Sequence, residues 1–92
     1  MENKQNILAQ LREIPGVGKS IAEDLWDLGM RSINDLENKE PELLYQQMCV
    51  MQGQKVDRCV LYVFRCAVYY ASNTTHNPEL LKWWNWKDRE SA

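Results

Sequence analysis

Residues 15–18 read Pro-Gly-Val-Gly, and this short run constrains the fold more than any other part of the chain. Proline pushes the residue before it out of the α region, and glycine adopts backbone conformations that other residues avoid. Apolar residues at helical spacing lie on both sides of the run, at Ile7, Leu8, Leu11, Ile21, Leu25 and Leu28. The sequence therefore predicts two helices joined by a tight turn.

A short connector is predicted after the second helix. Gly29 stands where a left-handed C-cap belongs. Ser32 and Asp35 then have the spacing of a weak capping box, which is typical of a helix start. We expect a connector helix at about residues 32–37.

Two longer helices and a C-terminal helix complete the predicted architecture. Pro41 opens the first of them and Gly53 closes it, with a stripe of Leu44, Met48 and Met51. The second covers residues 54–71, and its apolar stripe consists of Val56, Val60, Val63, Ala67 and Tyr70. Asn77, Pro78 and Glu79 start a short tryptophan-rich helix over about residues 77–86. No segment alternates as a strand does, so the fold class is all-α.

Length and composition indicate a single domain over residues 1–92. A content of 45% hydrophobic and 26% charged residues is typical of soluble proteins. No apolar run approaches the ~20 residues of a membrane helix, and the N-terminus lacks a signal-peptide pattern. We expect a cytoplasmic protein without membrane contact. The net charge of −2 excludes binding of polyanions through bulk positive charge, but not a local phosphate site.

Catalytic and metal chemistry have little support. The chain has one histidine, His76, and its three cysteines cannot all pair with one another. Cys59 and Cys66 would lie ~10.5 Å apart along one helix, too far for a shared zinc ion or a disulfide. We expect Cys59 to pack in the core. A nuclease would need metal bound by acids of the second helix, and exposed helical acids are usually only solvated. We expect no enzyme, no metal and no cofactor.

The predicted turn suits a phosphate oxygen. Gly16 and Gly18 let a ligand approach the main chain closely. The second helix begins directly afterwards, so its unpaired N–H groups point into the turn. Lys19 adds a cation and Ser20 a hydroxyl.

The same turn can also serve as a plain connector or as a protein-docking module. Glu13, Glu23 and Asp24 lie near it and bring negative charge. A surface dominated by these acids favours docking of a protein. A surface where Lys4 and Lys19 converge with Lys55 favours DNA.

The segment from Leu8 to Leu28 resembles the helix-hairpin-helix motif of DNA-binding proteins. The resemblance implies that the amides of Gly16, Gly18 and Lys19 grip one backbone phosphate without reading sequence, while Val17 is buried between the helices. Some members of this class also hold a monovalent cation on hairpin carbonyls, which here would be those of Arg12, Ile14 and Val17.

A second, degenerate copy of the motif follows. A shift of 35 residues places Gly18 on Gly53 and Leu25 on Val60. The pattern is similar to that of paired helix-hairpin-helix units, here about residues 3–29 and about residues 41–71.

The second hairpin departs from the motif. Met51 and Gln52 stand where Gly16 and Val17 stand in the first copy, which weakens the case for phosphate binding. Lys55 and Arg58 still offer charge for a second contact.

The long helix carries a mixed face of Arg58, Tyr62, Arg65 and Tyr69. This face could bind phosphate, bases or a partner, or it could pack beneath the C-terminal tryptophans, and we favour packing. Trp83, Trp84 and Trp86 cannot all face one core from one short helix. We expect at least one to be partly exposed and to offer a partner surface.

The whole chain resembles the small bacterial pathogenicity-locus family, whose members are also labelled mitomycin-resistance-like. The resemblance rests on the first hairpin, the Val56–Tyr70 helix and the Leu80–Asp88 tail. It implies a helix-hairpin-helix fold, a presumed DNA-binding role and no reaction.

Two functions therefore remain. The first is a small non-enzymatic DNA-binding protein that contacts the nucleic-acid backbone through residues Gly16, Val17, Gly18, Lys19 and Ser20. The second is a protein–protein adaptor that docks through the Trp83, Trp84 and Trp86 tail or the Tyr62 and Arg65 face, with a purely structural hairpin. The sequence does not indicate the oligomeric state.

Overall fold

The computed structural model describes residues 3–87. Asp88, the last residue of the tail motif, lies outside them. Within this range the chain is helical and contains no strand, which confirms the predicted all-α class. The elements are α1 (Lys4–Leu11), α2 (Lys19–Asp27), the 3-10 helix η1 (Ile33–Leu36), α3 (Pro41–Gln52), α4 (Arg58–Ser72), and the 3-10 helices η2 (Pro78–Leu81) and η3 (Trp83–Trp86).

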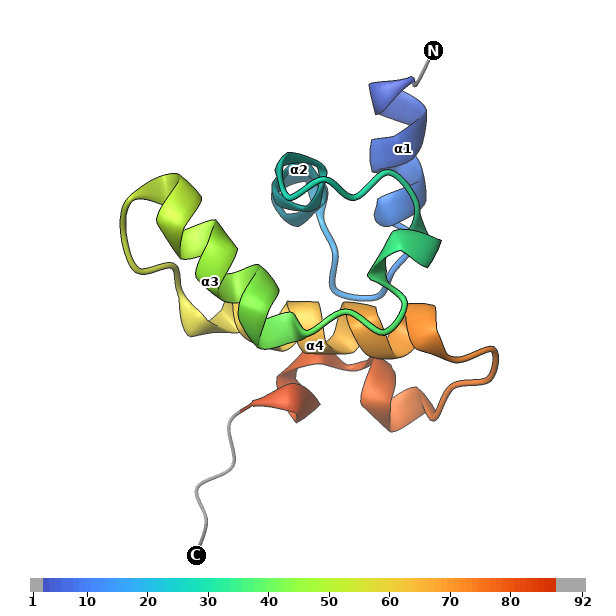
Figure 1. Cartoon of the computed structure of the whole chain (residues 1–92). Helices are drawn as coiled ribbons and strands as arrows, with labels where there is room; N and C mark the ends of the chain where they lie inside the picture. The colour runs from blue at the N-terminus through green and yellow to red at the C-terminus, as the bar shows by residue number, and fades with distance from the viewer. Residues whose placement is uncertain (1–2, 88–92) are drawn as a thin grey trace, which may run out of the picture.

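Helix α4 lies at the centre of the fold (Figure 1). Helices α1 and α2 pack against each other, α3 packs on α4, and η1, η2 and η3 all contact α4. The predicted stripe of α4 faces the core: Val63 and Ala67 are buried, and Val56, Val60 and Tyr70 pack against the core from its edge. Phe64 is the largest of the fully buried side chains.

Several predicted helix ends are confirmed. Gly29 and Gly53 have φ angles of +96° and +66°, in the left-handed region that favours glycine. The Ser32 hydroxyl accepts from the Asp35 amide at 3.3 Å, which is one half of the predicted capping box, while the Asp35 carboxylate accepts from the Arg31 amide at 2.8 Å. Pro41 occupies the first turn of α3.

The predicted start of the long helix at residue 54 is wrong. Helix α4 begins at Arg58, because the Asp57 carboxylate caps it by accepting from the Cys59 amide at 2.9 Å. The repeat alignment is also wrong at one point. Gly53 ends α3, whereas Gly18 precedes α2 with an ordinary φ of −93°, so the two glycines have different tasks.

The predicted single helix over residues 77–86 is in fact two 3-10 helices separated at Lys82. The Asn85 side chain donates to the Glu79 carbonyl at 2.6 Å, and the Trp86 indole donates to the Leu80 carbonyl at 2.7 Å. An α-helix would need both carbonyls for its own amides four residues later. In this structure side chains donate to these two carbonyls, and the Lys82 amide donates to the Glu79 carbonyl three residues back, as in a 3-10 helix.

Two residues expected in the core are exposed. Met51 is at the edge of the α3 stripe, because the buried face of this helix runs through Leu44, Tyr45 and Met48 instead. Cys59 shares a helical face with Cys66, but it lies in the first turn of α4, where its side chain is exposed while Leu61 is fully buried. No helix in this part of the chain is long and apolar enough to cross a membrane.

Candidate nucleic-acid interface

The turn between α1 and α2 is held in place by buried apolar side chains. Ile14 and Val17 are buried, and the Val17 amide donates to the Ile14 carbonyl at 3.0 Å. Burial of Val17 is what the helix-hairpin-helix resemblance implied. The turn is thereby fixed against the core while its glycines remain at the surface.

The N-terminus of α2 is open. Gly18 is its N-cap and supplies no side-chain hydrogen bond. Within residues 3–87, no acceptor pairs with the amides of Gly18, Lys19 and Ser20, and all three residues are exposed. A Cβ placed on Gly18 would meet nothing within 4 Å. An anion can therefore approach this helix end, where the backbone dipoles favour negative charge.

Gly16 has a different surrounding. Its φ is +87°, and a Cβ placed on it would lie 3.0 Å from Trp83 Cδ1 and 3.3 Å from Trp83 Cβ. The tryptophan segment thus packs directly on the turn, a contact that the sequence did not reveal. Gly16 is required for the backbone conformation and for this contact, whatever its amide binds.

The charges beside the turn are mixed. Arg12 and Lys19 line a small cavity of about 370 Å³ together with Gln5 and Glu23. Glu23 is paired with Lys4 at 3.2 Å, which offsets one of the acids near the turn. The sequence pointed only to the carbonyl of Arg12. The spacing of the residues did not show that Arg12 and Lys19 line the same cavity, because this depends on how α1 and α2 pack.

The second hairpin has a different helix start. At the N-terminus of α4 the Asp57 carboxylate takes the place that an external anion would need. The Tyr45 hydroxyl donates to the Val56 carbonyl and ties the turn to α3. Of the two cations proposed for a second contact, Lys55 is exposed and Arg58 lies over the Tyr45 ring, 5.6 Å from its centroid. The second helix is therefore capped by a carboxylate in the second hairpin and has no side-chain cap in the first.

Asp57 gives the stability of the fold a defined pH dependence. Hydrogen bonds from the Cys59 amide and then the Cys59 thiol lower the pKa of Asp57 from its ordinary 3.8. A lowered pKa stabilises the folded state above the unfolded value and loses this effect as the pH falls through the folded value. We expect wild type to melt above Asp57→Asn near pH 7, because asparagine caps without a charge, and this difference to disappear as the pH falls below 3.8 and through the lowered pKa of Asp57. Thermal melts followed by circular dichroism between these pH values measure it; a constant difference would contradict it.

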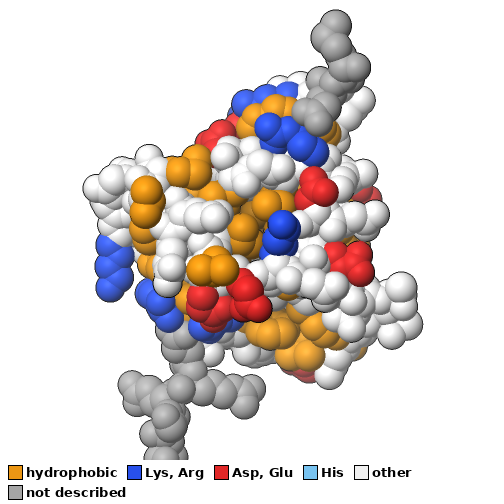
Figure 2. Space-filling view, viewed as in Figure 1, with side chains coloured by type: hydrophobic (Ala, Val, Ile, Leu, Met, Phe, Trp, Pro, Cys, Tyr) orange, Lys and Arg blue, Asp and Glu red, His pale blue; other side chains and the backbone are white. Residues whose placement is uncertain are grey.

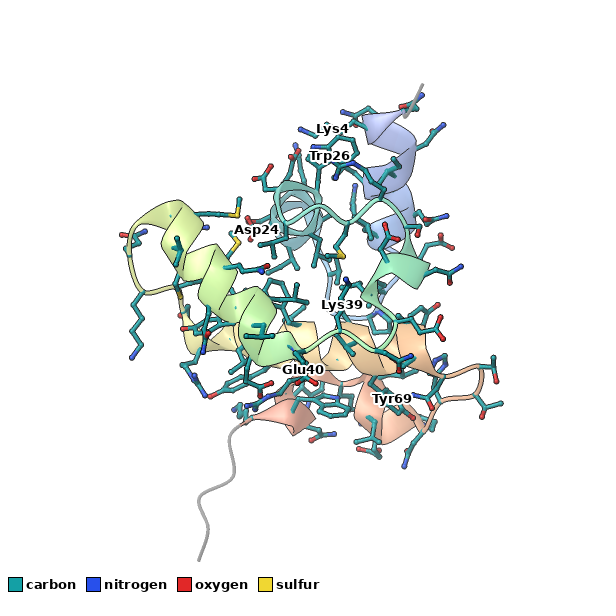
Figure 3. All side chains as sticks on the ribbon, viewed as in Figure 1. Lys4, Asp24, Trp26, Lys39, Glu40 and Tyr69 are labelled. Atoms are coloured by element: carbon teal, nitrogen blue, oxygen red, sulfur yellow. The ribbon has the colours of Figure 1, made fainter. Side chains whose placement is uncertain are left out.

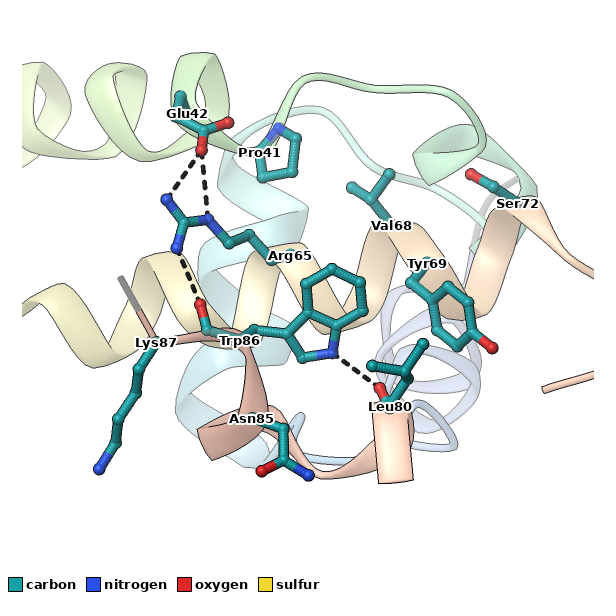
Figure 4. A pocket seen from close by; sticks show the side chains of 10 residues that line it. All are labelled: Pro41, Glu42, Arg65, Val68, Tyr69, Ser72, Leu80, Asn85, Trp86 and Lys87. Atoms are coloured by element: carbon teal, nitrogen blue, oxygen red, sulfur yellow. Dashed lines mark hydrogen bonds and ion pairs between the residues drawn. The ribbon is translucent and has the colours of Figure 1, made fainter. Parts of the chain in front are cut away.

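Arg65 and Tyr69 of the mixed face pack against the tryptophan segment, as favoured from the sequence, whereas Arg58 of the same face lies over Tyr45 of α3. Arg65 donates to the Glu42 carboxylate at 2.9 Å and to the Trp86 carbonyl at 2.8 Å (Figure 4). It also lies over the Tyr62 ring, 5.7 Å from the centroid. The Tyr69 and Trp86 rings are 5.5 Å apart between centroids. A cavity of about 630 Å³ remains between this face, the start of α3 and the tail.

The three tail tryptophans are in different surroundings. Trp83 packs against the core and Trp86 is partly buried. Trp84 is 50% exposed and meets Trp83 edge to face, with 5.8 Å between ring centroids. The expectation of at least one exposed indole is confirmed.

Cys66 and His76 are engaged in packing. Burial raises the pKa of the Cys66 thiol to about 11, so this thiol stays protonated at neutral pH. His76 stacks on Tyr70 with 4.7 Å between ring centroids, and its Nε2 lies 2.8 Å from the Tyr70 carbonyl oxygen. In the described range, no three His, Cys, Asp or Glu side chains gather closely enough to hold a metal ion.

Comparison with known proteins identifies the family. Residues 4–92 match the model of the Cdd1 family, described as a pathogenicity locus. The mitomycin resistance protein McrB of Streptomyces lavendulae is 30% identical over 78 residues, which is 85% of this chain and 70% of that protein. No solved structure gives a significant match. With nearly its whole length matched, the chain belongs to the Cdd1 pathogenicity-locus family.

Proposed function

We propose that the chain is a small non-enzymatic DNA-binding protein whose first hairpin binds one backbone phosphate without reading sequence. The observation that carries this proposal is the open N-terminus of α2. Its amides at Gly18, Lys19 and Ser20 are exposed and have no acceptor within residues 3–87. Helix N-termini bind phosphate through such amides, and phosphate contacts carry no sequence information.

The charge around the turn indicates weak binding. Lys19 and Arg12 are the cations beside it, Glu13 adds a negative charge, and the Lys4–Glu23 ion pair adds no net charge. We expect a dissociation constant of ~10⁻⁴–10⁻⁶ M, as for other non-specific contacts, and a salt slope set by about one or two phosphates. One relative is named as a mitomycin resistance protein. We propose that this chain also contributes to mitomycin resistance, through its binding to DNA.

A single charge at Gly18 tests the proposal. In Gly18→Asp, the new carboxylate should accept hydrogen bonds from the first amides of α2, as the Asp57 carboxylate does at α4. Its negative charge should also repel phosphate. The φ of −93° and the open space around Gly18 tolerate the side chain, and aspartate is a good N-cap, so the fold stays intact. We expect at least about tenfold weaker binding of labelled duplex DNA in fluorescence anisotropy at about 50 mM salt.

Gln52→Asp is the matched control. It adds the same charge at an exposed position at the end of α3, away from the first hairpin, and should change affinity little. Equal binding by Gly18→Asp and wild type, or no binding by wild type at high micromolar protein, would contradict the proposal. Gly16 is unsuitable for this test because any side chain there meets Trp83.

The alternative is an adaptor that docks through the tryptophan tail with a purely structural hairpin. Exposed Trp84 is the observation in its favour, since indoles are frequent at the centres of interfaces. The anisotropy experiment separates the two functions, because an adaptor of this kind does not bind DNA in a Gly18-dependent way.

A further inference from the structure

A groove lies between α2 and the outer side of α3. Leu28 forms its α2 wall, and Leu43, Val50 and Met51 form its α3 wall, around a cavity of about 450 Å³. A second cavity of about 420 Å³ shares Leu28 and Leu43 with the first and extends the groove toward Glu40. Figure 2 shows hydrophobic side chains gathered on this face of the molecule.

The apolar residues of this groove are not needed by the core. Val50 is 81% exposed, and Leu43 and Met51 are more than half exposed. Leu43 and Val50, seven residues apart, lie on the side of α3 opposite the buried face that packs on α4, and Met51 lies at the edge between the two sides. Most exposed apolar residues occur singly, whereas a contiguous set of this kind marks an interaction site.

The length of the groove matches a helical partner. Helix α3 has 12 residues and therefore spans about 18 Å, or three to four helical turns. Amphipathic helices bind in such grooves through anchors spaced i, i+3 or i+4, and i+7.

The rim of the groove is acidic. Asp27 lines it at the α2 side and Glu40 at the start of α3, and neither forms an ion pair within residues 3–87. Asp24 is labelled in Figure 3 on the side of α2 turned toward α3. Burial raises the pKa of Asp24, and the nearby charges of Asp27 and then Glu23 raise it further. Lys39 is the one cation among the lining residues.

We propose that this groove binds a basic amphipathic helix of a partner protein. The helix would place its apolar side on Leu28, Leu43, Val50 and Met51, and lysine or arginine residues would lie opposite Asp27 and Glu40. Complementary charge of this kind orients a helix in a groove and selects against acidic partners. The surface is separate from the first hairpin, and its negative charge makes it unsuited to nucleic acid, so the proposal does not depend on the proposed function.

Two synthetic peptides test the proposal. Both have about four turns and leucines at i, i+3, i+4 and i+7; one carries lysine on its polar side and the other glutamate. Titration of the ¹⁵N-labelled chain with the lysine peptide should shift amide resonances of α3 and the end of α2. Val50→Asp should weaken binding at least about tenfold, although it adds a negative charge that attracts the peptide in general. Gln52→Asp, with the same charge outside the lining, should bind as wild type does.

Asp27→Asn tests the charge separately. It should weaken the binding of the lysine peptide about threefold or more while leaving the apolar contact in place. Shifts scattered over the whole surface, undiminished binding by Val50→Asp, or equal binding of the glutamate peptide would each overturn the proposal. So would a concentration-dependent dimer in sedimentation that Val50→Asp abolishes, because the groove would then belong to a second copy of the chain.

Discussion

Replacement of Phe64 by alanine should lower the free energy of unfolding by about 3–5 kcal/mol. Phe64 has no exposed surface and lies on α4, the helix that α3, η1, η2 and η3 all contact. Removing the ring leaves a cavity between these elements, and they are joined to one another mainly through α4. Small domains have a total stability of about 5–15 kcal/mol, so the variant should be close to unfolding at room temperature. Urea denaturation followed by circular dichroism measures the loss.

Val50→Ala is the control for this prediction. It removes apolar atoms from a helix that packs on α4, but from a side chain that is 81% exposed. We expect a change within about 0.5 kcal/mol. Similar losses for both variants would mean that α4 is not the centre of the core.

Gly16→Ala should lower the free energy of unfolding by about 2–4 kcal/mol. Two causes add here. The φ of +87° is unfavourable for any residue with a Cβ, and the new methyl group would lie 3.0 Å from Trp83 Cδ1, inside van der Waals contact. Trp83 must then move away from the turn, which also disturbs its edge-to-face contact with Trp84.

Gly29→Ala separates the two causes. Gly29 has a similar φ of +96°, but a Cβ there meets nothing within 4 Å, so the cost should be the backbone strain alone, about 1–2 kcal/mol. When Trp83 is already replaced by alanine, the further step Gly16→Ala should likewise cost little more than Gly29→Ala does alone, because the ring that the new methyl group would meet is gone. Near-ultraviolet circular dichroism should report the altered tryptophan environment in Gly16→Ala only. Equal losses for the two single glycine variants would contradict the packing of Trp83 on the turn.

The structure changes the interpretation of the partner surfaces more than that of the hairpin. Arg65 and Trp86, named from the sequence as partner residues, are engaged with each other and with Glu42. The sequence did not predict the exposed apolar surface at Leu43, Val50 and Met51, because Met51 has the spacing of the core stripe. Only the rotation of α3 on α4 decides which of several apolar residues is covered.

The elements that the sequence predicted correctly depend on neighbours along the chain. Pro41 starts a helix, Gly29 and Gly53 end helices, and Ser32 caps one, because each acts on backbone groups within a few residues. The open amides of α2 follow in the same way from a glycine at the N-cap.

Tertiary structure decided the rest, because it depends on groups far apart in the sequence. Trp83 lies on Gly16 only because α4 brings the tail beneath the first hairpin. The tail forms two 3-10 helices whose geometry is set by side-chain contacts, among them the hydrogen bond from the Trp86 indole to the Leu80 carbonyl. Helical periodicity is set by backbone hydrogen bonds between residues three or four apart, whereas burial is set by whichever element packs on a face, and spacing alone does not contain that information.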